Sequence, residues 1–156
     1  MRSAGFPNRA EPPNLTLDDG KRPDGVTLIP YAMGKPLVWD GTVWSTLCAS
    51  HVRDTAARAG AAAEKAAAAK LRKYARFEWD YLLTPLTFES HGPTSAATAE
   101  FVESLAKQIG RARGYRRTES VFLQRLSLAI QRGNALSVLG SMGADEREDG
   151  PTVCPC

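Results

Sequence analysis

Asp24, Asp40 and Lys70 are the residues of this chain whose types and spacing could do chemistry together. Asp24 follows a proline, and Asp40 interrupts an apolar run that contains Trp39. A carboxylate inside such a run must reach solvent or find a partner, because burying an unpaired charge is costly. A divalent cation is one such partner for two converging carboxylates, since Mg²⁺ prefers oxygen ligands. Two carboxylates, a cation and a lysine could hydrolyse a phosphate ester, with the lysine positioning water or stabilising charge.

A short β-hairpin is the element that must bring the two aspartates together. Asp24 opens the first strand, and a turn follows at Met33-Gly34-Lys35. Residues 36–44 are rich in Val, Trp and Leu, as strands are, and Asp40 lies among them. We therefore expect the two aspartates at neighbouring ends of the hairpin.

A long helix, from about His51 to Phe77, is predicted to carry the lysine, because its alanine-dense centre favours helix. Placing residues at about 100° each groups apolar residues on the face expected to pack on the sheet: Val52, Ala56, Ala59, Ala63, Tyr74 and Phe77. The opposite basic face is expected to meet solvent or a ligand: Arg58, Lys65, Arg72 and Arg76. Lys70 falls on the apolar face, so its amine either extends to an edge or reaches a carboxylate.

The remaining elements predict an α/β fold. Residues 78–88 are aromatic and aliphatic and predict a strand. Because Pro85 cannot donate a backbone hydrogen bond, part of this strand should lie at a sheet edge or in a bulge. Glu89 ends this strand and is either a further ligand, a general base or a structural surface residue. Helices follow at about 94–113 and 118–139, the second with a potential break at Gly133 and Asn134. This order predicts a small mixed sheet (hairpin plus further strand) packed by a long helix and followed by two helices.

The length of 156 residues allows one domain. Residues 1–20 and 141–156 read as disordered tails, because they offer little to bury, which leaves 21–140 as the folding part. The N-terminus lacks the apolar stretch of a signal peptide, and no run approaches the roughly 20 apolar residues of a membrane span. We expect an intracellular protein without a membrane or small-molecule partner.

The basic residues indicate a polyanionic partner. The net charge is +3, and four acidic residues lie in the C-terminal tail, so the folding part is more basic than the total. Tyr115 is flanked by four basic residues that could contact phosphates while the ring stacks on a base: Arg111, Arg113, Arg116 and Arg117. The alternative is a solvated linker between helices. Cys48, Cys154 and Cys156 complete neither a disulfide framework nor a zinc site within the chain.

Three stretches together resemble one known family. The chain is similar to the restriction-enzyme-like endonuclease domain, of PD-(D/E)XK type, at the C-terminus of certain non-LTR retrotransposon proteins. The stretches are Arg22-Pro23-Asp24, the run from Leu37 to Val43, and Lys70-Leu71-Arg72-Lys73-Tyr74. Residues 88–92 and 122–135 also look like the segments that follow reverse transcriptase in invertebrate elements. The resemblance covers roughly residues 21–140.

This resemblance implies an element that nicks target DNA so that a reverse transcriptase can prime from the cut. Asp24 and Asp40 would take the metal-ligand places for Mg²⁺ or Mn²⁺. Lys70 or Lys73 would be the lysine that this branch of the family carries on the following helix, whereas Thr42 stands where the simplest pattern has lysine. The implied partners are DNA and the reverse transcriptase region of the parent element, and the implied compartment is the nucleus.

Two alternatives stay open beside a metal-dependent endonuclease. One is a catalytically inactive remnant that binds nucleic acid or protein, and the other is a purely structural helical domain. A Pro-Asp pair is common in turns, where the aspartate bonds to its own backbone, and Asp40 could simply pair with Lys35 or an arginine. A structural domain predicts that Asp24 and Asp40 do not converge.

Overall fold

A four-stranded mixed sheet forms the centre of the computed structural model, which describes residues 1, 4–114 and 118–142. The strands lie in the order β1 (Asn8–Ala10), β2 (Gly25–Thr27), β3 (Leu37–Trp44) and β4 (Leu82–Glu89). β2 pairs antiparallel with both β1 and β3, whereas β3 and β4 are parallel along eight residues each. The predicted hairpin and mixed α/β fold are confirmed.

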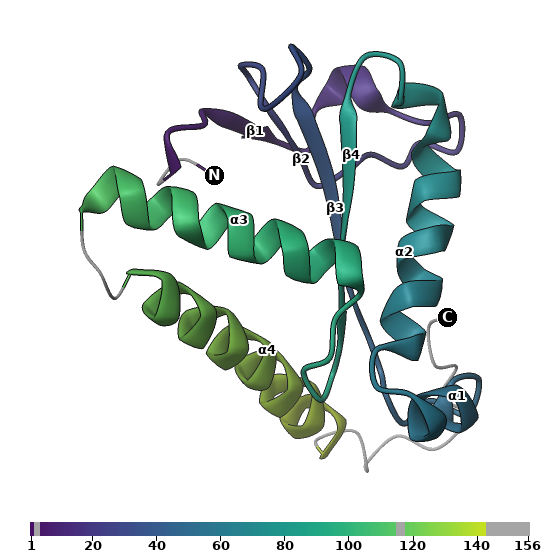
Figure 1. Ribbon diagram of the computed structural model, residues 1–156. Coiled ribbons are helices and arrows are strands. Elements are labelled where there is room, and N and C mark those ends of the chain that lie inside the picture. The colour runs from purple at the N-terminus through teal and green to yellow at the C-terminus, as the bar shows by residue number, and fades with distance from the viewer. Residues whose placement is uncertain (2–3, 115–117, 143–156) are drawn as a thin grey trace.

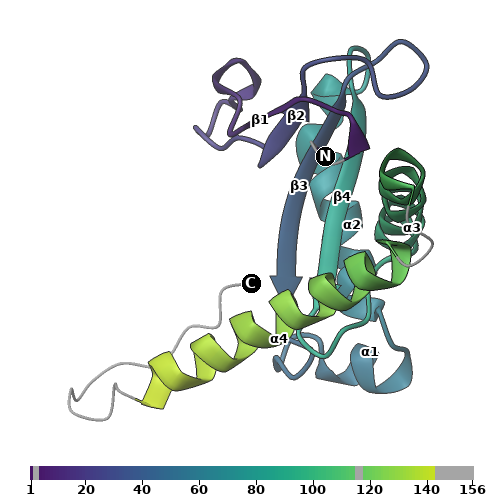
Figure 2. The same cartoon turned by 90° about the vertical axis from the view of Figure 1, so that its left-hand side faces the viewer.

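Helices cover both sides of β3 and β4 (Figures 1 and 2). α2 (Ala61–Tyr74) lies on one side and α3 (Ala96–Arg113) on the other, with α4 (Thr118–Met142) beside α3. A short α1 (Val52–Ala57) precedes α2, and 3₁₀ turns lie at η2 (Pro13–Leu15) and η3 (Ala75–Phe77). No helix of the described residues is long and apolar enough to cross a membrane.

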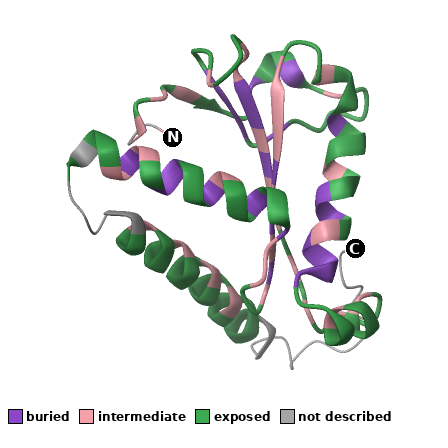
Figure 3. Ribbon diagram, viewed as in Figure 1, coloured by how far each residue is buried: buried purple, intermediate pink, exposed green. Residues whose placement is uncertain are grey.

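The single long helix predicted for residues 51–77 is broken at Gly60. The φ angle of Gly60 is 84°, a left-handed conformation that glycine adopts without steric cost. A Cβ at this position would lie 2.9 Å from the Thr94 carbonyl oxygen, so the chain also passes closely there. As a result, Val52, Ala56 and Ala59 are exposed instead of packing on the sheet, whereas Ala63 and Tyr74 are buried as expected (Figure 3).

The N-terminal segment belongs to the fold. β1 extends the sheet beyond β2, and Leu15 packs in a core cluster with Val26 and Val38. The expectation of a disordered tail over 1–20 therefore differs from the structure, because the sheet provides both an edge and an apolar pocket for this segment. In the tail predicted for 141–156, residues 141–142 end α4 and residues 143–156 lie outside the described part.

The later boundaries shift by a few residues from the predicted ones. β4 begins at Leu82, since residues 78–81 continue the turn after η3, and β4 is an edge strand that tolerates Pro85. α4 continues through Gly133 and Asn134, where a break was predicted. The Asn134 side chain donates a hydrogen bond to the Ser90 carbonyl, which ties α4 to the loop after β4.

Candidate active site

The register of the hairpin brings Asp24 and Asp40 together. Gly25 pairs with Trp39 and Val26 with Val38, so continuing the antiparallel register by one residue places Asp24 opposite Asp40. Only glycine fits at position 25 in this register, because a Cβ there would lie 2.2 Å from the Trp39 ring.

Asp24 lies just before β2 and is held against β3 by its side chain. Its Oδ2 accepts a hydrogen bond of 2.6 Å from the Gly41 amide, the residue after Asp40. The Asp24 carbonyl accepts a second bond, of 3.0 Å, from the Glu11 amide. No other described residue donates a hydrogen bond to the Asp24 carboxylate. Since a carboxylate offers about four lone-pair positions, most of them remain for another ligand.

Lys70 reaches Asp40 from α2. Its Nζ lies 2.6 Å from Asp40 Oδ2, and the two side chains are only 18% and 10% exposed. The predicted position of Lys70 on the apolar face is therefore explained, because its amine meets a carboxylate on the sheet. A pair this deeply placed loses hydration and depends on close geometry.

Lys73, the other candidate lysine, contacts a different group. Its Nζ donates to the Tyr74 hydroxyl at 2.9 Å and lies 4.6 Å from the centre of the same ring. Tyr74 in turn donates to the Arg22 carbonyl at 3.1 Å. α2 therefore contacts both halves of the site, with Lys70 on Asp40 and Tyr74 on the residue two before Asp24.

Tyr74 is a hydrogen-bond donor in this environment. Burial raises its pKa far above the ordinary value, and the Asp40 carboxylate, through its charge and a side-chain hydrogen bond, and the charge of Asp24 add to the effect. The ring is 3% exposed. The phenol consequently keeps its proton at neutral pH and has no role as a base.

A small cavity lies beside the ion pair, on the α2 side of the sheet. It has a volume of about 10 Å³ and is lined by Asp40, Lys70, Tyr74 and Thr84, among others. Such a volume holds about one water molecule, given several polar partners. A single water could thus be placed next to both the carboxylate and the amine.

The donor set of this site fits a hard divalent cation. Asp24 and Asp40 offer carboxylate oxygens, and Lys70 offsets one of the two negative charges. Among the described residues, no group of three or more His, Cys, Asp or Glu side chains could hold a metal ion. A cation here would therefore rely on two carboxylates, water and substrate oxygens, a set that is usual for Mg²⁺.

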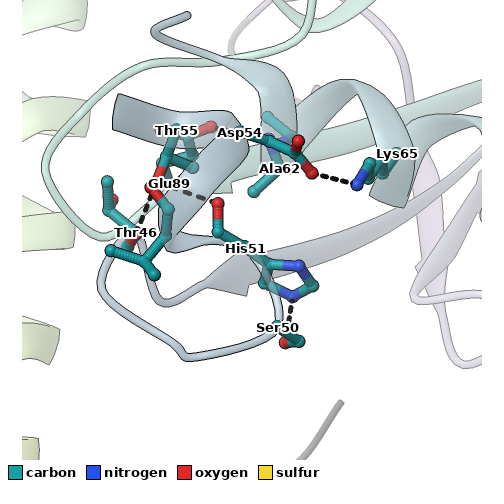
Figure 4. Close-up of polar contacts among 10 residues, drawn as sticks. Thr46, Ser50, His51, Asp54, Thr55, Ala62, Lys65 and Glu89 are labelled. Carbon is teal, nitrogen blue, oxygen red and sulfur yellow. Dashed lines mark hydrogen bonds and ion pairs between the residues drawn. The ribbon is translucent and has the colours of Figure 1, made fainter. Parts of the chain in front are cut away.

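Glu89 lies outside this site and is buried, unlike the surface residue that the sequence suggested. Its exposure is 0%, and its Oε1 accepts hydrogen bonds from the Ala62 and Ala63 amides, at 2.9 and 3.4 Å. These amides begin α2, where a carboxylate also benefits from the helix dipole. Glu89 thereby anchors the start of the helix that carries Lys70 (Figure 4). Sequence reasoning missed this role, because it depends on how β4 and α2 pack.

The basic residues predicted to bind nucleic acid are dispersed. Lys65 pairs with Asp54, and Arg76 pairs with Asp18. Other members of the predicted set are exposed: Arg58, Arg72 and Arg111. The described part of the chain does not include the Arg113 side chain or residues 115–117, which hold Tyr115, Arg116 and Arg117. The structure thus leaves the basic cluster between α3 and α4 as a prediction.

His51 and His91 have local partners. The His51 ring stacks on Trp44 with centroids 4.4 Å apart, and its Nε2 lies 3.2 Å from the Ser50 hydroxyl (Figure 4). His91 is exposed in the turn after β4, with Nδ1 3.2 Å from the Ser90 hydroxyl. His51 therefore packs at the start of α1, and His91 lies in the turn that follows β4.

No model of a protein family matches this chain, and a search of curated proteins likewise finds no match.

Proposed function

We propose that this chain is a metal-dependent DNA endonuclease domain, related to those of non-LTR retrotransposon proteins, that nicks target DNA by phosphodiester hydrolysis. The observation that carries the proposal is the Lys70–Asp40 ion pair, together with the hydrogen bond from the Gly41 amide, the residue after Asp40, to the Asp24 carboxylate; the three residues are up to 46 apart in the sequence. Turn formation explains an Asp-containing hairpin, but it does not require a lysine from a distant helix. A purely structural helical domain also predicts no such convergence.

The residues of the site have distinct roles in this proposal. Asp24 and Asp40 would hold Mg²⁺ or Mn²⁺, which, when bound, polarises a phosphate oxygen and promotes water as the nucleophile. Lys70 orients a water molecule near the cavity or stabilises negative charge on the phosphate. Of the two candidate lysines, we assign this role to Lys70, because Lys73 bonds to Tyr74.

DNA is the proposed polyanionic partner. Arg22 and Lys73 are both exposed. Arg22 precedes Asp24 by two residues and its carbonyl accepts from Tyr74, and Lys73 bonds to Tyr74, so both lie next to the site. Their charges would meet phosphate oxygens on either side of the cleaved bond. The reverse transcriptase region of the parent element would be the protein partner, and the nucleus the place of action, as the resemblance implies.

A second candidate function is an inactive remnant that binds nucleic acid or protein. It is favoured by the fact that both carboxylates already have partners, Lys70 for Asp40 and the Gly41 amide for Asp24. A decayed site would keep these contacts and the basic surface without cutting DNA.

A nicking assay on supercoiled plasmid with Mg²⁺ or Mn²⁺ separates the two candidates. Asp40→Asn and Lys70→Met should each abolish metal-dependent nicking. Matched controls are Asp54→Asn and Lys107→Met, since these residues form exposed ion pairs elsewhere, with Lys65 and Glu103. Wild-type protein that binds DNA without nicking it in either metal would refute the nuclease and favour the remnant.

A further inference from the structure

The Arg22-Pro23-Asp24 segment is fixed at several points. The Arg22 carbonyl accepts the Tyr74 hydroxyl, Pro23 is fully buried, and Asp24 Oδ2 accepts the Gly41 amide. Proline fixes its own φ angle, so the position of the Arg22 carbonyl strongly influences the position of the Asp24 backbone. Of these contacts, only the one from Tyr74 comes from α2.

Tyr74 and Lys70 are spaced i and i+4 on α2 and therefore share one face of the helix. Lys70 contacts Asp40, while Tyr74 contacts the segment that ends in Asp24. One face of one helix thus contacts both the Asp40 carboxylate and the segment that ends in Asp24. Lys73 completes the arrangement by donating to the phenol oxygen, which leaves the phenol proton directed at the Arg22 carbonyl.

We infer that Tyr74 is a positioning residue, which holds Asp24 at the distance from Asp40 and Lys70 that a shared cation needs. This inference rests on the proposed function for the cation, but the positioning of Asp24 is measurable without it. Removing the hydroxyl should loosen the Asp24 contact with Gly41 and weaken cation binding, while leaving the packing of the ring intact.

The direct measurement is hydrogen exchange of the Gly41 amide, followed by NMR in protein labelled with ¹⁵N-glycine. Tyr74→Phe should increase the exchange rate of this amide about fivefold, the effect of losing a hydrogen bond of about 1 kcal/mol. Asp24→Ala sets the upper limit of the effect. Tyr31→Phe is the matched control, because its hydroxyl also has a hydrogen bond, of 3.2 Å from Gln108, while its ring packs on Phe6 and Phe101.

Mn²⁺ titration by calorimetry provides the second readout. Tyr74→Phe should raise the Kd for Mn²⁺ about fivefold, and Tyr31→Phe should leave it unchanged. Wild-type protein that binds no Mn²⁺ would refute the proposed metal site, and the Gly41 amide would then decide the positioning role alone.

Unchanged Gly41 exchange in Tyr74→Phe would overturn the inference, as would faster exchange spread evenly over all glycine amides. If Tyr74→Phe does not fold, Lys73→Met replaces it, because it removes the amine that orients the phenol and keeps the ring. It should accelerate Gly41 exchange in the same direction and by a smaller factor, and no acceleration would refute the role of Tyr74.

Discussion

Removing Lys70 should destabilise the fold through the charge left on Asp40. Breaking a buried ion pair by deleting one partner costs about 3–5 kcal/mol when both charges are fully buried. Here Asp40 and Lys70 keep 10% and 18% of their side-chain exposure, and a cavity for about one water lies beside them. We therefore expect Lys70→Met to lower the free energy of unfolding by about 2–3 kcal/mol. Asp40→Asn should cost less, about 1–2 kcal/mol, because a lysine amine can extend toward solvent.

The double variant distinguishes an ion pair from two independent effects. Replacing both charges removes the unpaired carboxylate, so the double variant should be more stable than the sum of the single changes predicts, by about 2 kcal/mol. Urea unfolding followed by far-UV circular dichroism measures each corner of the cycle, with constant m values as the check on two-state behaviour. The exposed Glu103–Lys107 pair is the control cycle and should show a coupling near zero. Additive effects of the Asp40 and Lys70 changes would refute the pairing on which the site depends.

Three further perturbations test the elements that position the site. Gly60→Ala should lower stability by more than 1 kcal/mol, because it combines a positive φ with a close approach to the Thr94 carbonyl; Gly34→Ala, with φ of 73° and open space, should cost less in the same thermal melts. Glu89→Gln should destabilise the protein by about 1–2 kcal/mol through the loss of charge at the start of α2, and an equal melting temperature would contradict the capping role. Tyr74 should stay protonated in the folded state at pH values where it ionises in the unfolded chain, since its pKa is raised above the ordinary 10.0. The stability that Tyr74 contributes is therefore fully present below pH 10.0 and is lost as the pH rises above that value. The difference in ultraviolet absorbance between wild type and Tyr74→Phe during an alkaline titration measures this, and a transition near pH 10 would refute it.

The hairpin and the elements around it could be predicted from local patterns. Apolar strand residues on both sides of a turn identified β2 and β3, and the position of Lys70 on an apolar face left two alternatives for its amine, an edge or a carboxylate, of which the structure shows the carboxylate. These features depend on neighbours within a few residues. They also explain why Asp24 and Asp40 were expected to converge.

Other features depend on tertiary contacts that no local pattern reports. The break at Gly60 was missed because the surrounding alanines favour helix, whereas the decisive contact is with Thr94, 34 residues later. The burial of Glu89 follows from α2 beginning directly beside the end of β4. Leu15 appeared to lie in a disordered tail, because its pocket is made of residues from β2 and β3 that are distant in the sequence.

The charges of the site provide the strongest physical argument for a cation. Like charges close together across an antiparallel pair are destabilising, and Asp24 and Asp40 directly flank the last residue pair of β2 and β3, Gly25 and Trp39. Lys70 offsets one negative charge, so the three side chains retain a net charge of −1. If the Gly41 contact were the only role of residue 24, the neutral Asp24→Asn variant would accept the same hydrogen bond without the repulsion. Asp24→Asn should therefore stabilise the metal-free protein and remove the stabilisation that Mn²⁺ gives the wild type, because a cation that binds only the folded state raises its melting temperature. Melting curves with and without Mn²⁺ measure both effects, and an asparagine variant that is less stable without metal would refute the argument from repulsion.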